Sequence, residues 1–526
     1  MLRQRWLGRV AYQDAHALQH GLFAHSADDH LLLLEHPHVF TLGPRGSLDH
    51  LLVDPVAVGA EVVHTDRGGD ITYHGPGQLV GYPILTVPGK RGGGMADTVA
   101  YVHSVEQLLM DVLGDLGLTD VGRVEGLAGV WVAPDSPRPR KVAAIGVKLS
   151  RGRSMHGFAL NVDPDLVWFD RIVPCGITDK GVTSLRAEGI EVTMARVVEA
   201  VMARAAERWG AEGEERAEVK ALPSEVPVRV GGLAVAERKP EWLRAPVRLG
   251  EDYRELRKRM RRLDLVTVCE EAGCPNISEC WADGTATFML NGERCTRACG
   301  FCLVDTNKPD APPEADEPER VADAVAEMRL RFAVLTAVAR DDLPDGGAGQ
   351  FARTVEAIRR RDPRVEVEVL IPDCKGDPEA LGTIFAARPD VLNHNLETVA
   401  RLQRAVRPSA GYARSLSVLA RAKAAGLTTK SGMILGLGET EDEVVAALAD
   451  LRAVGTDIVT LGQYLRPTAR HLPVRRWWHP EEFGRLKAAG EALGLAHVEA
   501  GPLVRSSYHA REAADQAGAT PLVDAG

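Results

Sequence analysis

Six of the chain's eight cysteines lie within the 34 residues that run from Cys269 to Cys302. An even distribution would place only about half a cysteine in a segment of that length. The other two cysteines, Cys175 and Cys374, stand alone. Because the cytosol keeps thiols reduced, such a cluster in a large chain indicates a metal centre rather than disulfides. The fold must therefore gather several thiols around metal, whereas the isolated Cys374 is expected in a hydrophobic core.

Charge and hydrophobicity narrow the class of protein. With 63 Lys and Arg against 73 Asp and Glu, the net charge is −10, so no basic field favours nucleic acid as a partner. The longest apolar runs, such as 31–34 and 333–338, are far shorter than the ~20 residues that cross a bilayer. The first residues resemble neither a signal peptide nor a transit peptide. We therefore expect a cytoplasmic protein that uses neither a membrane nor nucleic acid.

The first ~210 residues have the size and alternating pattern of one α/β domain. Its predicted elements are strands at 30–34, 79–87, 142–149 and 155–162, the last two forming a hairpin, and amphipathic helices starting at Asp97 and Met194. The segment that follows, Glu212–Glu225, is charged and poor in apolar residues. Such composition is typical of a linker, so we predict a domain at 1–211 and a linker at 212–229.

The second half repeats a strand followed by a helix. The strand-like runs are 286–290, 332–338, 365–371, 391–394, 428–435 and 457–461. Six such units predict a parallel sheet with right-handed crossovers, hence a partial (β/α)6 barrel at about 285–500 within a domain at 230–526. Chemistry in such barrels lies on the loops after the strands. The run Cys295–Cys302 follows the first strand and is therefore predicted at this rim.

The cysteine spacing divides the cluster into two triads. They are Cys269, Cys274 and Cys280, with C-x4-C-x5-C spacing, and Cys295, Cys299 and Cys302, with C-x3-C-x2-C spacing. A structural zinc site usually takes four ligands from two close pairs. Three cysteines better suit a [4Fe–4S] cluster that keeps one iron open to another ligand. The residues themselves favour iron–sulfur chemistry and leave zinc as the alternative.

The C-x3-C-x2-C motif after the first strand resembles that of the radical S-adenosylmethionine superfamily. The resemblance implies that the open iron binds S-adenosylmethionine and that one electron cleaves it to a 5′-deoxyadenosyl radical. The Cys269–Cys280 run is similar to the auxiliary-cluster motif of the lipoyl synthase family. Further similar runs are 238–243, 340–343, 393–398, 436–440 and 505–509.

The lipoyl synthase resemblance implies a second [4Fe–4S] cluster, which gives up its sulfur. Its ligands would be Cys269, Cys274, Cys280 and Ser507. A serine oxygen binds iron weakly, which suits a cluster that must release sulfide. Taken alone, Ser507 would be read as a turn or capping residue.

Cys175, taken alone, would be read as an inert core residue. A nucleophilic cysteine needs a neighbour that favours the thiolate, such as an ammonium group, and spacing alone cannot bring Lys141 to it. The run Arg67–Gln78, however, is similar to the signature of the lipoyl(octanoyl) transferases. Runs at 141–146, 156–162 and 174–176 follow in that family's order.

This second resemblance implies the α/β fold of biotin and lipoate protein ligases. Cys175 would take an octanoyl group as a thioester, with Lys141 lowering the pKa of its thiol. The substrate tunnel would be lined by Arg67, Gly68, Gly69, Asp70, Ile71, Thr72, Tyr73, His74, Ala144, Ile145, Gly146, Gly157, Phe158 and Ala159. Glycines there would let the backbone approach the chain and offer N–H groups to the thioester oxygen. His74 and His156 could assist proton transfer or be structural.

Together the resemblances imply a natural fusion of two consecutive enzymes. The first half would move octanoyl from octanoyl-acyl carrier protein to a lysine of a lipoyl domain, in 2-oxoacid dehydrogenases or the glycine cleavage H protein. The second would insert sulfur at C6 and C8, using S-adenosylmethionine, two [4Fe–4S] clusters and an external low-potential electron donor. Two alternatives remain. One is an ATP-dependent ligase fused to a tRNA methylthiotransferase, and the other is a non-catalytic iron–sulfur carrier with an acyl-binding domain.

Overall fold

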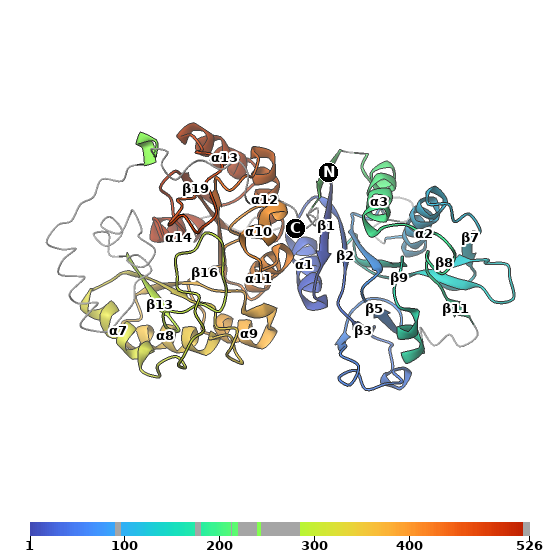
Figure 1. The fold of residues 1–526 in the computed structure, drawn as a ribbon, viewed down its shortest axis with the longest axis horizontal. Helices are drawn as coiled ribbons and strands as arrows, with labels where there is room; N and C mark the ends of the chain where they lie inside the picture. Colours follow the sequence, from blue (N-terminus) through green and yellow to red (C-terminus); the bar gives the residue numbers. More distant parts are fainter. Residues whose placement is uncertain (90–95, 174–179, 212, 219–238, 244–284, 519–526) are drawn as a thin grey trace. The chain divides into compact units, whose positions relative to one another are not determined.

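The computed structural model describes residues 1–89, 96–173, 180–211, 213–218, 239–243 and 285–518 (Figure 1). The chain divides into two compact units, Met1–Ala221 and Leu222–Gly526. Each unit has its own sheet and its own hydrophobic core. In the part of the chain described, no helix is long and apolar enough to cross a membrane.

The first unit is built on a mixed nine-stranded sheet in the order β12-β1-β2-β6-β10-β9-β8-β7, with β11 paired to β9. Its strands are β1 (Leu2–Arg9), β2 (Asp29–Glu35), β6 (Gln78–Ile84), β7 (Val121–Val124), β8 (Leu127–Val132), β9 (Arg140–Ser150), β10 (Arg153–Asn161), β11 (Gly181–Val182) and β12 (Glu214–Glu218). Every residue of β6 is buried, as expected of a strand covered on both faces.

The predicted hairpin of β9 and β10 is confirmed. Arg151 and Gly152 at its tip have φ angles of +50° and +72°. A two-residue turn with two positive φ angles matches the right-handed twist of the strands it joins. The hairpin therefore holds the register that brings Gly146 opposite Gly157.

Three helices pack on this sheet: α1 (Tyr12–His25), α2 (Thr98–Asp115) and α3 (Met194–Trp209). The predicted cap of α2 is confirmed, since the Asp97 side chain accepts a hydrogen bond from the Ala100 N–H at 3.1 Å. Fully buried side chains of α2 and α3, such as Val105 and Val201, share one core with the sheet. Helix α1 contacts β6 and β10, and it thereby contributes to the site described below.

A second, three-stranded sheet in the order β4-β3-β5 completes this unit. Its strands are β3 (Val39–Leu42), β4 (Glu61–His64) and β5 (Ile71–His74). The 3-10 helix Leu48–His50 lies between β3 and β4, and the 3-10 helix Leu166–Arg171 contacts β5. Phe40 and Tyr73 from this sheet pack with Trp168 and Phe169 in a separate aromatic core.

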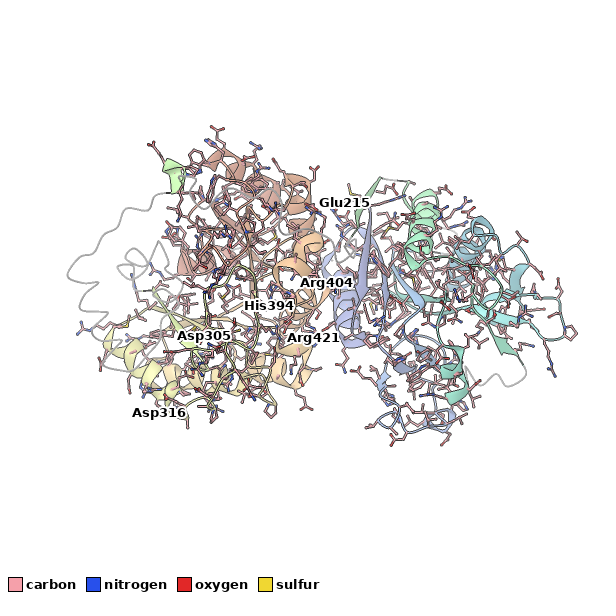
Figure 2. The ribbon with its side chains drawn as sticks, viewed as in Figure 1. Glu215, Asp305, Asp316, His394, Arg404 and Arg421 are labelled. Carbon is pink, nitrogen blue, oxygen red and sulfur yellow. The ribbon has the colours of Figure 1, made fainter. Side chains whose placement is uncertain are left out.

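Residues 214–218 differ from the prediction, because the segment expected to be a linker forms the edge strand β12. It pairs in parallel with β1. The Glu215 carboxylate, labelled in Figure 2, accepts hydrogen bonds from the guanidinium groups of Arg3 and Arg5 on β1. Charged residues suit a sheet edge because one side of the strand faces water. The charged composition that indicated a linker is therefore equally compatible with an edge strand.

The second unit contains a seven-stranded sheet in the order β13-β14-β15-β16-β17-β18-β19, with every neighbouring pair parallel. The strands are β13 (Thr285–Leu290), β14 (Phe332–Ala337), β15 (Glu366–Leu370), β16 (Val391–Asn393), β17 (Thr428–Leu435), β18 (Ile458–Gln463) and β19 (His497–Gly501). The six predicted strands are confirmed. The seventh, β19, was not predicted because its five residues include only two clearly apolar side chains.

The helices between these strands are α7 (Glu317–Glu327), α8 (Ala348–Arg361), α9 (Pro378–Ala386), α10 (Gln403–Val406), α11 (Tyr412–Ala424), α12 (Glu441–Ala453) and α13 (Pro480–Ala492), and α14 (Ala510–Gly518) follows β19. Consecutive helices pack side by side, as α7, α8 and α9 do in Figure 1. One core joins α7, α8, α9 and α11 to the first strands and includes Cys374. Cys374 is 5% exposed, so its predicted place in a core is confirmed.

Candidate functional site

The first unit holds a pocket, open to solvent, where α1, β5 and β6 meet the β9–β10 hairpin. It is lined by Tyr12, Arg67, Gly68, Gly69, Thr72, His74, Val80, Tyr82, Ala144, Ile145, Gly146, His156, Gly157, Phe158 and Ala159. Most of the residues that the sequence assigned to a substrate tunnel are thus brought together here from three separate segments. Tyr12, Val80 and Tyr82 were missed because they lie outside the motifs.

Three residues of the predicted lining, Asp70, Ile71 and Tyr73, do not line this pocket. Successive side chains of a strand point to opposite faces. Thr72 and His74 of β5 therefore face the pocket, whereas Ile71 and Tyr73 are fully buried in the aromatic core on the other side. Asp70 instead shares a hydrogen bond with Nδ1 of the His50 ring, at 2.5 Å.

Glycine backbones form much of the pocket wall. A Cβ atom on Gly157 would lie 2.2 Å from the Gly81 carbonyl oxygen and 2.4 Å from Cδ of Pro83. The Gly68 N–H donates to the Val147 carbonyl at 3.0 Å, which ties the glycine loop to β9. Any side chain at Gly157 would displace the backbone of β6, so only glycine permits this close approach.

Polar side chains around the pocket are held by neighbours rather than by solvent. The buried Arg67 guanidinium donates to the Thr41 carbonyl at 2.6 Å. The His74 ring bonds the Gln78 side-chain oxygen at 2.7 Å. Burial lowers the pKa of His74 to about 3, with the nearby His36 adding to the effect, so this imidazole is neutral at physiological pH. The pocket is therefore walled by apolar surface and glycine, with few and fixed polar groups.

The predicted nucleophile, Cys175, lies outside the described residues. Lys141 is on β9, half-buried, with its ammonium 4.6 Å from the centroid of the Trp131 ring. The segments that flank residues 174–179 are both placed. The Val173 N–H donates to the His50 carbonyl at 2.8 Å, and Val182 of β11 pairs directly with Lys141.

The predicted cysteine triad of the second unit follows β13, on the loop between β13 and α7. Cys295, Cys299 and Cys302 are each half-buried and make no disulfide. The Cys295 N–H donates to the Asp305 carbonyl at 2.8 Å, and the His471 ring bonds the Cys302 carbonyl at 2.8 Å. These backbone contacts fix the loop without using the sulfur atoms.

Arg297, between the first two cysteines, ties this loop to the ends of two other strands. Its guanidinium donates twice to Asp341 after β14, each at 2.8 Å, and once to Asp373 after β15, at 2.6 Å. Burial alone would raise the pKa of Asp373, but the Arg297 charge outweighs it and holds that pKa below its usual value. Arg297 was treated as a spacer in the sequence, and nothing in its spacing indicated this role.

The donor set of the loop fits an iron–sulfur cluster. Burial raises the pKa of the Cys299 thiol and raises that of Cys302 to about 11, so both stay protonated at neutral pH unless a cationic centre binds them. Metal binding supplies that centre and releases the protons. Three such thiols leave one position of a cubane cluster open to another ligand.

The second cysteine triad, Cys269, Cys274 and Cys280, lies outside the described residues. Ser507, predicted to complete its site, is half-buried after β19. The adjacent Ser506 hydroxyl accepts a hydrogen bond from the Asn395 side chain at 2.8 Å. The same Asn395 amide donates to Glu397, whose pKa is raised by burial. The run 505–509 therefore reaches the rim at the carboxyl end of β16.

Comparison with known proteins also divides the chain into two parts, with a boundary between residues 206 and 213 that lies slightly before the end of the first unit at Ala221. Residues 11–206 match the lipoyl protein ligase A/B catalytic domain, residues 213–274 the N-terminal domain of lipoyl synthase, and residues 291–451 the radical SAM superfamily. A lipoyl synthase of Mycolicibacterium paratuberculosis is 54% identical over 299 residues, which are 57% of this chain and 94% of that protein. A lipoyl synthase of Mycobacterium avium is 58% identical over 274 residues, 52% of this chain and 89% of that protein.

Among solved structures, a bipartite lipoate protein ligase from Thermoplasma acidophilum aligns with a TM-score of 0.34 and 15% identity, covering 41% of this chain and 86% of that one. A TM-score of this size establishes no shared function.

Proposed function

Because this chain belongs, through its C-terminal part, to the lipoyl synthase family, and because a lipoyl protein ligase A/B catalytic domain precedes that part, we propose that it performs two consecutive steps of protein lipoylation. The first unit transfers octanoyl from octanoyl-acyl carrier protein to a lysine of a lipoyl domain. The second inserts two sulfur atoms into the bound octanoyl chain. The observation that carries this proposal is one chain with an apolar, glycine-walled pocket in one unit and a cysteine rim in the other.

The acyl transfer proceeds through a thioester on Cys175. Its thiolate attacks the thioester carbonyl of octanoyl-acyl carrier protein, and the carrier's thiol leaves with a proton. The lysine amine of the lipoyl domain then attacks the new thioester, forming an amide and releasing Cys175. Lys141 supports the thiolate by its positive charge. The pairing of Lys141 with Val182, seven residues beyond Cys175, supports this assignment.

The pocket suits an eight-carbon chain in this mechanism. Val80, Ile145 and Phe158 offer apolar surface, so an octanoyl chain loses contact with water when it enters. Gly68 and Gly146 have no side chains, so they leave space for the acyl chain. Lipoyl domains of 2-oxoacid dehydrogenases and the H protein are the acceptors we expect.

Sulfur insertion uses the residues of the second rim. Cys295, Cys299 and Cys302 would hold one [4Fe–4S] cluster, and Cys269, Cys274, Cys280 and Ser507 would hold a second. When bound, these clusters would supply the electron for cleaving S-adenosylmethionine and the two sulfur atoms. Arg297 fixes the loop that carries Cys295, Cys299 and Cys302. An external low-potential donor must deliver the electrons.

The test is the intact mass of an apo lipoyl domain after anaerobic incubation with this protein and octanoyl-acyl carrier protein. We expect an octanoyl adduct without S-adenosylmethionine, and a gain of two sulfurs once S-adenosylmethionine and dithionite are added. Cys175→Ala should abolish the adduct. Cys299→Ala should leave the adduct and abolish the sulfur gain. Cys374→Ala, which removes a buried core cysteine that neither proposed cluster uses, is the matched control and should keep both activities.

Each alternative gives its own result in this assay. Octanoylation that requires ATP and free octanoate, and that survives Cys175→Ala, would identify a ligase. An adduct that never gains sulfur, despite measured iron and sulfide in the protein, would contradict the second step. Cluster spectra that S-adenosylmethionine leaves unchanged would indicate an electron carrier.

A further inference from the structure

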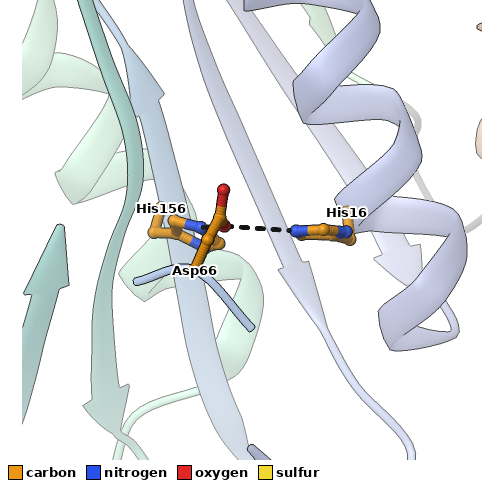
Figure 3. A group of neighbouring side chains, drawn as sticks. All are labelled: His16, Asp66 and His156. Atoms are coloured by element: carbon orange, nitrogen blue, oxygen red, sulfur yellow. Dashed lines mark hydrogen bonds and ion pairs between the residues drawn. The ribbon is translucent and has the colours of Figure 1, made fainter. Parts of the chain in front are cut away.

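Two histidines and an aspartate from three separate segments meet beside the first unit's pocket. They are His16 on α1, Asp66 before β5 and His156 on β10 (Figure 3). Nε2 of His156 lies 2.7 Å and Nε2 of His16 lies 3.4 Å from the same Asp66 oxygen, Oδ1. The potential ligand atoms of these three residues all lie within 4.8 Å of one another, and no other such group of three occurs among the residues that the structure describes.

A third histidine stands at the edge of this group. His20 is one helical turn beyond His16, so both rings project from the same face of α1. Their Nε2 atoms are 3.2 Å apart, and Nε2 of His20 is 3.8 Å from Oδ2 of Asp66. Three imidazole nitrogens and a carboxylate therefore converge, which is more than a single hydrogen-bonded pair requires.

The surroundings of the group shield it from water and fix its carboxylate. The His156 side chain is 2% exposed and the His16 side chain is 30% exposed. The Lys148 ammonium bonds Oδ2 of Asp66 at 2.6 Å and leaves Oδ1 to the histidines. A hydrogen bond to the outer oxygen of a ligating carboxylate is a common way to fix it in a metal site. The neighbouring Arg67 guanidinium turns away to Thr41.

The backbone of His156, whose ring bonds Asp66, has an unfavourable conformation. Its φ angle is +58°, in the left-handed region that residues other than glycine rarely adopt. Such strain persists where the surrounding structure enforces it and is concentrated at functional sites. Its N–H donates to Gln19 of α1 at 2.9 Å. Helix α1 thus fixes the backbone of His156 and also presents His16 and His20 to its ring.

We propose that His16, Asp66 and His156 bind a divalent transition-metal ion of the zinc type, with His20 as the fourth ligand. Imidazole nitrogen with carboxylate oxygen is a donor set that zinc takes readily. Ligands of tetrahedral zinc at ~2.0 Å from the ion lie ~3.3 Å apart. The His16–Asp66 and His16–His20 separations of 3.4 and 3.2 Å are close to that value. The ion would join α1 to β10 and to the loop that enters the pocket at Arg67. The site is independent of the acyl transfer proposed above, so either can fail without the other.

The test uses the full chain with its iron–sulfur clusters reconstituted anaerobically and its iron and sulfide measured, so that cysteines are occupied. After equilibrium dialysis against Zn²⁺, elemental analysis gives zinc per chain. We expect the double variant H16Q/H20Q to lose one equivalent relative to the wild type. His103→Gln, which removes an exposed histidine on α2, is the matched control and should keep it. Equal zinc in wild type and double variant would overturn the proposal.

A second measurement identifies the donors directly. In zinc X-ray absorption spectra the wild type should show only nitrogen and oxygen neighbours at ~2.0–2.1 Å, whereas zinc held by cysteine would show sulfur at ~2.3 Å. A sulfur shell would place the ion at the cysteines and would contradict the site. Asp66→Asn, whose amide keeps a similar shape, provides a second variant if the double variant fails to fold. It should weaken zinc binding at least tenfold, and unchanged affinity would count against Asp66 as a ligand.

Discussion

The two units build their sites by opposite means. The pocket of the first unit depends on residues without side chains, because Gly157 and Gly146 allow neighbouring chain segments to approach closely. The cysteine loop of the second unit depends on a charge that is present, because Arg297 ties it to two carboxylates. Adding a side chain at a glycine should damage the pocket, whereas removing a charged side chain should damage the cysteine loop. The two units should therefore respond to different substitutions.

The largest effect is expected from Arg297→Gln. The substitution leaves Asp373, which is fully buried, without its cation. Breaking a buried ion pair by removing one partner typically costs ~3–5 kcal/mol. The second unit should lose stability of that order in denaturant unfolding, and the iron bound per chain should fall, while octanoyl transfer continues. Arg485→Gln, which breaks an exposed pair with Glu441, is the matched control and should do neither. Normal iron content in Arg297→Gln would show that the cysteine loop binds iron without the ion pairs of Arg297.

Gly157→Ala should give the next largest effect, and in the first unit. The added methyl group would meet the Gly81 carbonyl at 2.2 Å and must push strands β6 and β10 apart. Overpacking of this kind typically costs ~1–3 kcal/mol. Acyl transfer should fall sharply, while sulfur insertion into a lipoyl domain that is already octanoylated should persist. Gly114→Ala on α2, where the new methyl group meets nothing within 4 Å, should be neutral or stabilising. Full acyl-transfer activity in Gly157→Ala would contradict the claim that the pocket requires glycine at this position.

A smaller and nearly equal loss is expected from removing one helix cap in each unit. Thr440 accepts from the Glu443 N–H while the Glu443 carboxylate accepts from the Thr440 N–H, so α12 begins with a capping box. Asp97 caps α2 with a single bond. Replacing either residue by Ala should cost ~1 kcal/mol, seen as a lower Tm of the corresponding unit. A loss several times larger at Thr440 would show that this helix start also supports the rim.

The smallest effect is a pH dependence at Glu188, which pairs with Arg140 of β9. Hydrogen bonds from Arg140, at 2.8 and 2.9 Å, lower the pKa of Glu188 below its usual value near 4.5. A carboxyl with a lowered folded pKa adds stability above its unfolded pKa, and that stability is lost as the pH falls through the folded value. Because Arg140 is 41% exposed, the contribution should stay below ~1 kcal/mol. Urea unfolding of Glu188→Gln at pH 7 and pH 3 should show a smaller pH difference than the wild type shows.

Local patterns in the sequence were sufficient for much of the fold. The alternation of strands and helices predicted six of the seven parallel strands, and Asp97 marked a helix start, because these signals lie within a few residues of one another. The strand β19 was missed because its parallel pairing with β18, rather than its own composition, makes it a strand. The edge strand β12 was taken for a linker because charged residues suit both.

The sites were predictable where motifs carry them and not where distant residues meet. The lining at Gly68, Ala144 and Gly157 came from the family resemblance, but only the strand alternation of β5 shows that Tyr73 faces the other way. The contact of His16 with Asp66 joins residues 50 positions apart, and that of Arg297 with Asp373 joins residues 76 apart. No local pattern encodes such contacts, because they depend on how the strands are ordered in the sheet.

The pairing of β12 with β1 decides where the protein can be divided into its two activities. A fragment that ends at residue 211 would leave the backbone of β1 unpaired at the sheet edge and would strip Arg3 and Arg5 of Glu215. Unpaired edges of this kind invite aggregation. A fragment extended through Glu218 keeps the edge strand and both ion pairs. Anyone who separates the acyl-transfer unit should therefore cut after Glu218, since the charged segment before it is part of the sheet.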